Sequence, residues 1–230
     1  MESGAFEADE VTELLRLFGN ESITHVINVG ANCGYYACLA RQHGLAVMAV
    51  EPMPLNVRIL LRNLMNNGWG DVEVFPVGVA EKPGLTKIFG VGTQASLLAG
   101  WASDNSKHYH LIPVTTLDHI VGNRGGKKLF IVDIEGAEYR LLQGADEQLR
   151  LTPRPVWMIE ICINQFQPEG VPLNPNLLPT FEIFWNLGYD GYVIGDEPRR
   201  PVTRARVTDW TQGKNLPPSH NFIFKRQRSS

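Results

Sequence analysis

The sequence predicts an α/β fold in which helices cover both faces of a mostly parallel sheet. Strand and helix patterns alternate along most of the 230 residues, which is typical of βαβ units. The run Ala46–Val50 is continuously apolar, as a strand buried on both faces usually is. Tyr189–Ile194 and Asn221–Lys225 are strand patterns with no helix pattern between them, so we expect them to pair antiparallel at one edge of the sheet.

The individual elements follow from apolar periodicity and from glycine, proline and asparagine at their ends. Helix patterns cover 10–18, 35–43, 54–66, 116–121, 136–144 and 177–187. Strand patterns cover 26–29, 46–50, 72–79, 84–89, 111–114, 129–133 and 155–161, besides the two at the end of the chain. The length suits one domain with a well-buried core, so we expect a single domain over 1–230 that begins with a helical segment, 1–22. The long segments 90–110 and 195–219 are predicted to be loops that form the substrate site.

Composition limits the classes of function. The net charge of -3 argues against binding driven by nucleic-acid phosphates. No apolar run is long enough to span a bilayer, and the acidic first ten residues lack the pattern of a secretion signal. Cys33, Cys38 and Cys162 have neither disulfide nor zinc spacing. We therefore expect a cytoplasmic protein with neither nucleic acid nor membrane as a partner.

The segment 26–40, VINVGANCGYYACLA, predicts a strand, a glycine turn and a helix N-terminus. Such turns hold nucleotide-like cofactors in α/β sheets. About twenty residues after Gly30, the next strand ends at Glu51, where a carboxylate can accept hydrogen bonds from both ribose hydroxyls. The turn from Gly30 to Gly34 lacks the middle glycine that a pyrophosphate requires. A ribose cofactor without pyrophosphate fits better, and S-adenosylmethionine is the common one.

The segment Asp133–Glu138, DIEGAE, places three carboxylates around a glycine after a buried strand. Ligands in open α/β sheets bind beyond the carboxyl ends of the strands, where Glu160 is also predicted. Glu138 has a structural interpretation, because an acidic side chain in a first helical turn complements the helix dipole. Burial of Asp133 near a second carboxylate would raise its pKa towards the range of a general base.

The chain resembles the FkbM family of S-adenosylmethionine-dependent methyltransferases. The resemblance rests on ordered blocks that span most of the chain: VINVGANCGYY at 26–36, VEPMPLNVRILLRNL at 50–64, PVTTLDHI at 113–120, IVDIEGAEYRLLQGA at 131–145 and NFIF at 221–224. It implies a class I methyltransferase fold, a Rossmann-like three-layer sandwich with a seven-stranded, mostly parallel sheet whose last strand is antiparallel. It also implies O-methylation of sugars, glycans or secondary metabolites.

The resemblance assigns residues to the cofactor and to the reaction. It implies that Gly30, Ala31, Asn32 and Gly34 line the methionine and ribose part of S-adenosylmethionine, that Glu51 holds the ribose, and that Pro52 and Met53 flank the adenine. Asn28 stands where relatives commonly have aspartate, and it keeps a hydrogen-bond acceptor without the charge. Ile131 stands where relatives often have lysine, so the role of that lysine does not carry over.

The reaction needs a hydroxyl oxygen aligned with the methyl group and a base that takes its proton. The candidate bases are Asp133, then Glu135, then Glu160. Carboxylate oxygens at Asp133 and Glu160 would also suit magnesium, which the sequence permits but does not require.

The acceptor is expected to contact side chains of the long loops. Ser96, which resembles a serine of the family's loop, His108 and His110 are the candidate substrate-binding residues. Trp101 and Trp210 are candidates for stacking on a sugar. Arg199, Arg200, Arg204 and Arg206 either recognise an acidic acceptor or form a solvated loop. Two alternatives stay open, a nicotinamide-dependent oxidoreductase and a non-catalytic module that binds S-adenosylmethionine.

Overall fold

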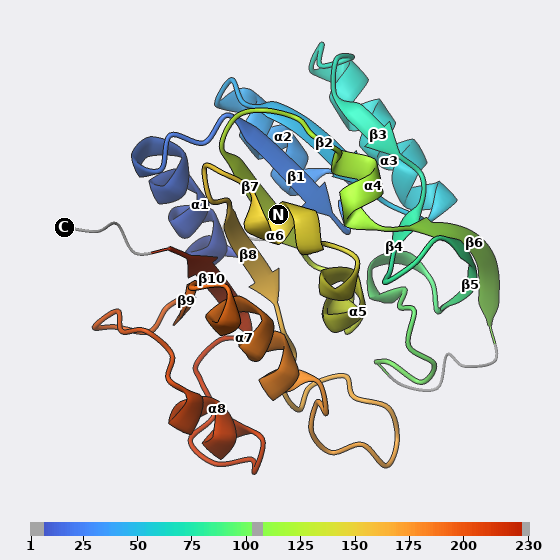
Figure 1. Ribbon diagram of the computed structural model, residues 1–230. Coiled ribbons are helices and arrows are strands. Elements are labelled where there is room, and N and C mark those ends of the chain that lie inside the picture. The colour runs from blue at the N-terminus through green and yellow to red at the C-terminus, as the bar shows by residue number, and fades with distance from the viewer. Residues whose placement is uncertain (1–6, 103–107, 227–230) are drawn as a thin grey trace.

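The computed structural model describes residues 7–102 and 108–226, and its central element is a sheet of seven strands (Figure 1). The strand order is β3-β2-β1-β7-β8-β10-β9. These strands are β1 (His25–Val29), β2 (Ala46–Val50), β3 (Glu73–Phe75), β7 (Lys128–Val132), β8 (Val156–Glu160), β9 (Asp190–Val193) and β10 (Asn221–Lys225).

The pairing of the strands confirms the predicted fold class. Strand β1 runs parallel to β2 and β7, and the pairs β2–β3 and β7–β8 are also parallel. Strand β10 lies between β8 and β9 and is antiparallel to both. In this register Val29 is level with Val50 and with Val132. The carboxyl ends of β1, β2 and β7 therefore meet at one edge of the sheet.

Helices cover both faces of the sheet, because side chains alternate along each buried strand. Val26 packs in one apolar cluster and Ile27 in the other. The cluster that contains Val26 includes residues of α1 (Ala8–Asn20), α2 (Tyr35–Gln42) and α3 (Pro54–Asn66). The other includes residues of α4 (Leu117–Val121), α5 (Glu138–Gln143), α6 (Asp146–Arg150), α7 (Leu177–Asn186) and α8 (Arg204–Trp210). The molecule is therefore a three-layer sandwich.

A second sheet of three strands lies beside the carboxyl ends of β2 and β3, at the right of Figure 1. It consists of β4 (Gly78–Val79), β5 (Gly84–Phe89) and β6 (Tyr109–Thr115), in the order β4-β6-β5. The predicted single strand over 72–79 is thus wrong. Pro76 separates β3 from β4 and has no N–H to donate to a ladder, so the chain leaves the large sheet there and enters the small one.

The segment 195–219 is not simply a loop, because it contains α8, whose N-terminus is capped by the Thr203 hydroxyl. Trp210 in this helix is fully buried, so the expectation that it stacks on a sugar is wrong. Three of the four arginines form ion pairs, Arg199 with Glu13, Arg204 with Glu182 and Arg206 with Asp196. The charges of these three arginines are therefore already paired within the fold.

The segment 90–110 is only partly a loop. It contains a short 3-10 helix, η1 (Gly92–Gln94), and its last two residues belong to β6. Residues 103–107 lie outside the described part of the chain. Among the described residues, no helix combines the length and apolar character that crossing a membrane requires.

Candidate active site

The turn after β1 packs directly on the residue that follows β7. Gly30 has a φ of 79°, and a Cβ placed there would lie 1.7 Å from the carbonyl oxygen of Asp133. The backbone N–H groups of Gly30 and Ala31 donate to the carbonyl oxygen of Val50 at 2.9 and 3.0 Å. A side chain at residue 30 would therefore collide with backbone, and the glycine holds the ends of three strands together.

The Glu51 carboxylate joins this turn to the start of α3. One oxygen accepts the Asn32 N–H at 2.9 Å, and the other accepts the Met53 N–H at 2.9 Å and the Asn56 side-chain amide at 3.2 Å. Only 4 % of Glu51 is exposed. Burial raises the pKa of Glu51, although the hydrogen bonds from Met53 and Asn32 oppose the rise. The carboxylate is thus fixed in orientation at the wall of a cavity.

The cavity lies at the carboxyl ends of β1, β2 and β7. Gly30, Asn32, Glu51, Pro52 and Met53, which the family resemblance assigns to the cofactor, all line it. The remaining lining residues are Val29, Val50, Asn56, Val77, Gly78, Val79, Ile88, Gly92, Thr93, Ala95, Leu97, Asp133, Ile134 and Glu135. The lining therefore combines carboxylates with apolar side chains that suit an adenine ring.

Three of the predicted cofactor residues lie behind this wall and are not among its lining residues. Ala31 is buried, and a Cβ on Gly34 would lie 2.4 Å from a methyl carbon of Leu60. Gly34 therefore allows α3 to pack closely on the turn. Asn28 is 1 % exposed, and neither its amide oxygen nor its amide nitrogen has a hydrogen-bond partner among the described residues. An unpaired buried amide is costly, so Asn28 weakens the strand that carries the turn.

The predicted carboxylates of Asp133, Glu135 and Glu160 come together, and the first two of them line the cavity. Asp133 follows β7, Glu160 ends β8, and Glu135 lies in the turn before α5. Each offers an oxygen, and these oxygens lie within 4.8 Å of one another. Asp133 Oδ1 is buried without a hydrogen-bond partner. Burial, together with the charge of Glu160, raises the pKa of Asp133 well above its ordinary value. Asp133 therefore binds a proton more readily than an ordinary aspartate does.

His220, which sequence reasoning missed, lies next to these carboxylates. Its Nε2 is 2.8 Å from Glu160 Oε1. Burial favours a higher pKa for Glu160, but hydrogen bonds from His220 and Asp133 bring that pKa below its ordinary value. The hydrogen bond to Glu160 raises the pKa of His220. The imidazole of His220 therefore lies beside a group of three acids, and its raised pKa favours the charged form.

A sequence signal for His220 did exist. The last strand is predicted to be antiparallel, so the residue just before it must lie at the edge where the parallel strands end. The register shows this directly, because Asn221 pairs with Glu160. A histidine immediately before such a strand is therefore a site candidate.

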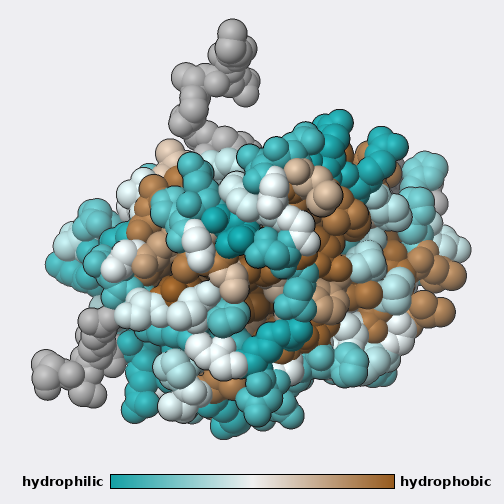
Figure 2. Space-filling model, turned by 90° about the horizontal axis from the view of Figure 1, so that it is seen from above, coloured by the Kyte–Doolittle hydropathy of each residue, from teal (hydrophilic) through white to brown (hydrophobic). Residues whose placement is uncertain are grey.

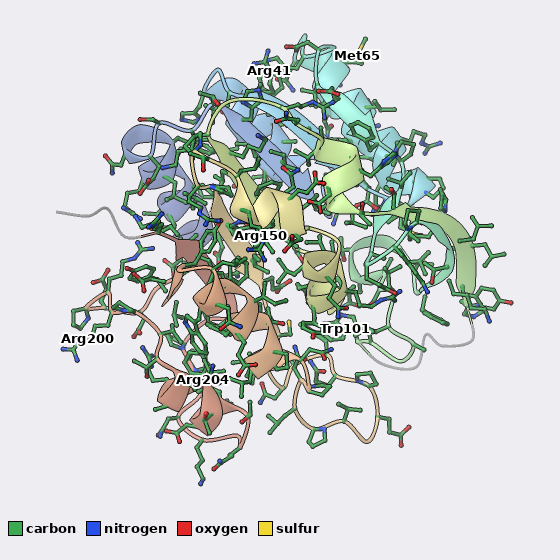
Figure 3. All side chains as sticks on the ribbon, viewed as in Figure 1. Arg41, Met65, Trp101, Arg150, Arg200 and Arg204 are labelled. Carbon is green, nitrogen blue, oxygen red and sulfur yellow. The ribbon has the colours of Figure 1, made fainter. Side chains whose placement is uncertain are left out.

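Trp101 clamps the loop after β5 onto the turn that carries Glu135. Its indole Nε1 donates to Glu135 Oε2 at 2.7 Å, and a Cβ on Gly136 would lie 2.5 Å from its ring. The Ser96 hydroxyl donates to the Glu135 carbonyl oxygen at 2.5 Å. Burial raises the pKa of Glu135, and the Trp101 hydrogen bond opposes the rise. Figure 3 shows Trp101 beside the start of α5, far from Arg200 and Arg204.

Other predicted residues have different surroundings. Glu138 is buried and accepts the Gly136 N–H at 3.0 Å, and burial raises its pKa to about 8. This contact agrees with a structural role for Glu138.

His108 and His110 are exposed and do not line the cavity, so their contact with a substrate stays a prediction. Glu160, Cys162 and His220 also lie within 4.8 Å of one another, and a requirement for a metal ion stays untested.

The strand order, the antiparallel last strands and the ribose-type carboxylate beside a glycine turn define a class I S-adenosylmethionine-dependent methyltransferase. The chain belongs to the FkbM family of these enzymes, because the Methyltransferase FkbM domain matches residues 28–190. This membership confirms the family resemblance, and it removes the support for a nicotinamide-dependent oxidoreductase.

Several solved structures are similar to this chain at low sequence identity. A precorrin-6y C5,15-methyltransferase from Geobacter metallireducens has a TM-score of 0.50 at 10% identity, with 94% of this chain and 86% of that chain covered. A ribosomal protein L11 methylase from Lactobacillus delbrueckii subsp. bulgaricus has a TM-score of 0.49 at 10% identity, with 95% and 79% covered. A SAM-dependent O-methyltransferase from Thermotoga maritima has a TM-score of 0.45 at 14% identity, with 96% and 66% covered. Among curated proteins, no sequence matches this chain significantly.

Proposed function

We propose that this methyltransferase acts on a hydroxyl oxygen of a sugar, a glycan or a secondary metabolite, with a carboxylate as general base. The observation that carries the proposal is Asp133, which lines the cavity with a raised pKa and has one buried oxygen without a hydrogen-bond partner. A carboxylate with a raised pKa is a stronger proton acceptor for a weakly acidic hydroxyl than an ordinary carboxylate. The net charge of -3 favours an acceptor other than nucleic acid, and we place the reaction in the cytoplasm.

The residues of the cavity fit S-adenosylmethionine. Glu51 would hold the ribose hydroxyls, because both of its oxygens are fixed at the cavity wall. Met53, Ile88 and Leu97 offer apolar surface to the adenine. When bound, this cofactor supplies an electrophilic methyl group. The enzyme therefore has to bind the acceptor, exclude water and take up one proton.

The contacts of the three candidate bases support the order Asp133, then Glu135, then Glu160. Asp133 has an oxygen without a partner, whereas an oxygen of Glu135 accepts the Trp101 indole N–H. Glu160 is engaged by His220 at 2.8 Å. Asp133 is the base in this proposal. Glu160, paired with His220, positions Asp133 and influences its pKa.

The proposed function is tested by transfer of a labelled methyl group from S-adenosylmethionine to a panel of sugars, glycans and polyhydroxylated metabolites. The expected product is a methyl ether, which survives mild alkali. A methyl ester would be hydrolysed under those conditions, and an N-methyl product would be recognised by mass spectrometry. Either of these products would contradict methylation of a hydroxyl oxygen, and binding of S-adenosylhomocysteine without turnover on any acceptor would support a non-catalytic module.

Replacing His220 by glutamine is expected to shift the acid limb of the kcat–pH profile to higher pH by about one unit or more. The imidazolium stabilises the negative charge shared by Glu160 and Asp133. Its removal raises the pKa of the carboxylate pair, so the base loses its proton at a higher pH. Glutamine keeps a hydrogen-bond donor for Glu160 and removes only the charge.

A matched control for this prediction is His119→Gln, because His119 is an exposed histidine of α4. The control is expected to leave the profile unchanged. An unchanged profile in His220→Gln would show that His220 does not influence the pKa of the carboxylate pair.

A further inference from the structure

The outer face of the β5–β6 hairpin is apolar and open to solvent. In the antiparallel register, Leu85 pairs with Pro113, Lys87 with Leu111 and Phe89 with Tyr109. These six residues share one side of the sheet because side chains alternate, and we call them the hairpin face. Leu85 is 75% exposed, Leu111 66% and Tyr109 48%. Such a contiguous patch usually marks an interaction site.

The start of α3 lies next to this hairpin. The Asn56 side-chain amide donates to the Gly92 carbonyl oxygen at 3.3 Å, directly after Val91, which is 68% exposed. The outward side of α3 carries Leu55, Arg58, Leu61, Arg62 and Met65, which are all exposed. Figure 1 draws α3 and the hairpin on the same side of the molecule, and Figure 2 shows several hydrophobic residues at the surface along the right edge, on the side of β5 and β6.

The charge of this region differs from that of the whole chain. The segments 54–66, 82–94 and 108–115 contain four Lys or Arg residues and no Asp or Glu, although the chain has a net charge of -3. Lys87 lies within the hairpin face, with its Nζ 4.0 Å from the centre of the Tyr109 ring. An amphipathic aromatic ring beside a cation is the combination that favours the interface between water and lipid. The charge complements an anionic surface.

We propose that the hairpin face, together with the outward side of α3, docks on the surface of an anionic lipid bilayer. The leucines insert among the acyl chains, while Lys87, Arg58 and Arg62 contact the headgroups. Ile88 and Gly92 belong to the same segment and line the cofactor cavity, so docking brings the cavity close to acceptors carried by lipid. The sequence prediction of no membrane partner rests on the lack of an apolar run long enough to span a bilayer, and docking on the surface of a bilayer does not require such a run.

A second copy of the chain would fit this face less well. A two-fold contact places like residues opposite one another, so Lys87 and the arginines of α3 would face a surface without acidic residues in either copy. Repulsion between like charges disfavours such a contact. A nucleic acid would match the cations but would leave the leucines in contact with phosphate.

The proposal is tested by co-sedimentation of the full chain with vesicles of phosphatidylcholine alone and of phosphatidylcholine mixed with phosphatidylglycerol. We expect binding to the mixed vesicles, weak binding to the neutral ones, and loss of binding at high salt. Lys87→Gln is expected to weaken binding to mixed vesicles about fivefold, the factor that corresponds to ~1 kcal/mol per cation near the surface. The double variant Leu85→Ser and Leu111→Ser is expected to weaken it roughly tenfold or more.

The matched controls are Arg200→Glu and Leu15→Ser, which change exposed residues outside this region and are expected to bind vesicles as the wild type does. Thermal stabilisation by S-adenosylhomocysteine checks that each variant is folded, and it does not depend on O-methylation. Three results would overturn the proposal: equal binding to neutral and mixed vesicles, no vesicle binding by the wild type, or a dimer in solution that the double leucine variant abolishes.

Discussion

Replacing Asp133 by asparagine is expected to lower kcat by roughly 10²–10⁴-fold and to leave the binding of S-adenosylhomocysteine nearly unchanged. Asparagine has almost the same shape, so the Gly30 turn, which packs on the backbone oxygen of residue 133, keeps its geometry. The amide cannot take up the proton of the substrate hydroxyl, which is the role that the proposal gives to the buried carboxylate. Loss of methyl transfer with retained cofactor binding would show that Asp133 acts in the reaction and is not needed for the fold.

The measurement combines turnover with a thermal shift, because a ligand that binds only the folded state raises Tm. Asp71→Asn is the matched control, since the Asp71 carboxylate forms an ion pair with Arg41 near the surface. It is expected to keep wild-type kcat. If Asp133→Asn retains full turnover while Glu135→Gln does not, the base is Glu135 and the order proposed here is reversed.

Replacing Gly30 by alanine is expected to lower the free energy of unfolding by roughly 2–5 kcal/mol and to abolish turnover. Two costs add in this variant. An L-residue at a φ of 79° is strained, and the new methyl group would collide with the backbone oxygen of Asp133 at 1.7 Å. Relief of the collision moves Asp133 itself, so stability and activity are expected to fall together.

Gly44→Ala separates the cost of backbone strain from the cost of the collision. Gly44 has a φ of 75°, and a Cβ there would meet nothing within 4 Å. This variant therefore carries the backbone strain alone, about 1 kcal/mol, and is expected to keep its activity. Urea unfolding of both variants measures the difference. Equal losses of stability would show that the contact between Gly30 and Asp133 contributes little.

The strands of the large sheet were predictable because their signals are local. Continuous apolar runs such as Ala46–Val50 define buried strands, and glycine turns separate them from helices. The cofactor wall was predictable for the same reason, since Gly30 and Glu51 end neighbouring strands and such ends meet at one edge. The split at Pro76 was readable in principle, because proline lacks the N–H that a continuous central strand requires.

The contacts between distant segments were not predictable in this way. The indole of Trp101 reaches Glu135 from a loop more than thirty positions earlier, and no periodicity relates the two. Arg199 is paired with Glu13 across nearly the whole chain, so a cluster of basic residues in the sequence becomes several separate ion pairs. The outer face of the hairpin is visible only once the register places Leu85 and Leu111 on the same side.

The position of β10 between β8 and β9 has a consequence for how the enzyme is made. Ribosomal synthesis delivers both neighbouring strands before residues 221–225, so the sheet has an incomplete pairing until the last strand arrives. His220 arrives with that strand and brings the imidazole whose Nε2 lies 2.8 Å from Glu160 Oε1. Until then, the carboxyl groups of Asp133, Glu135 and Glu160 lack this partner. Closure of the sheet and pairing of Glu160 with His220 are therefore a single late event in the synthesis of the chain.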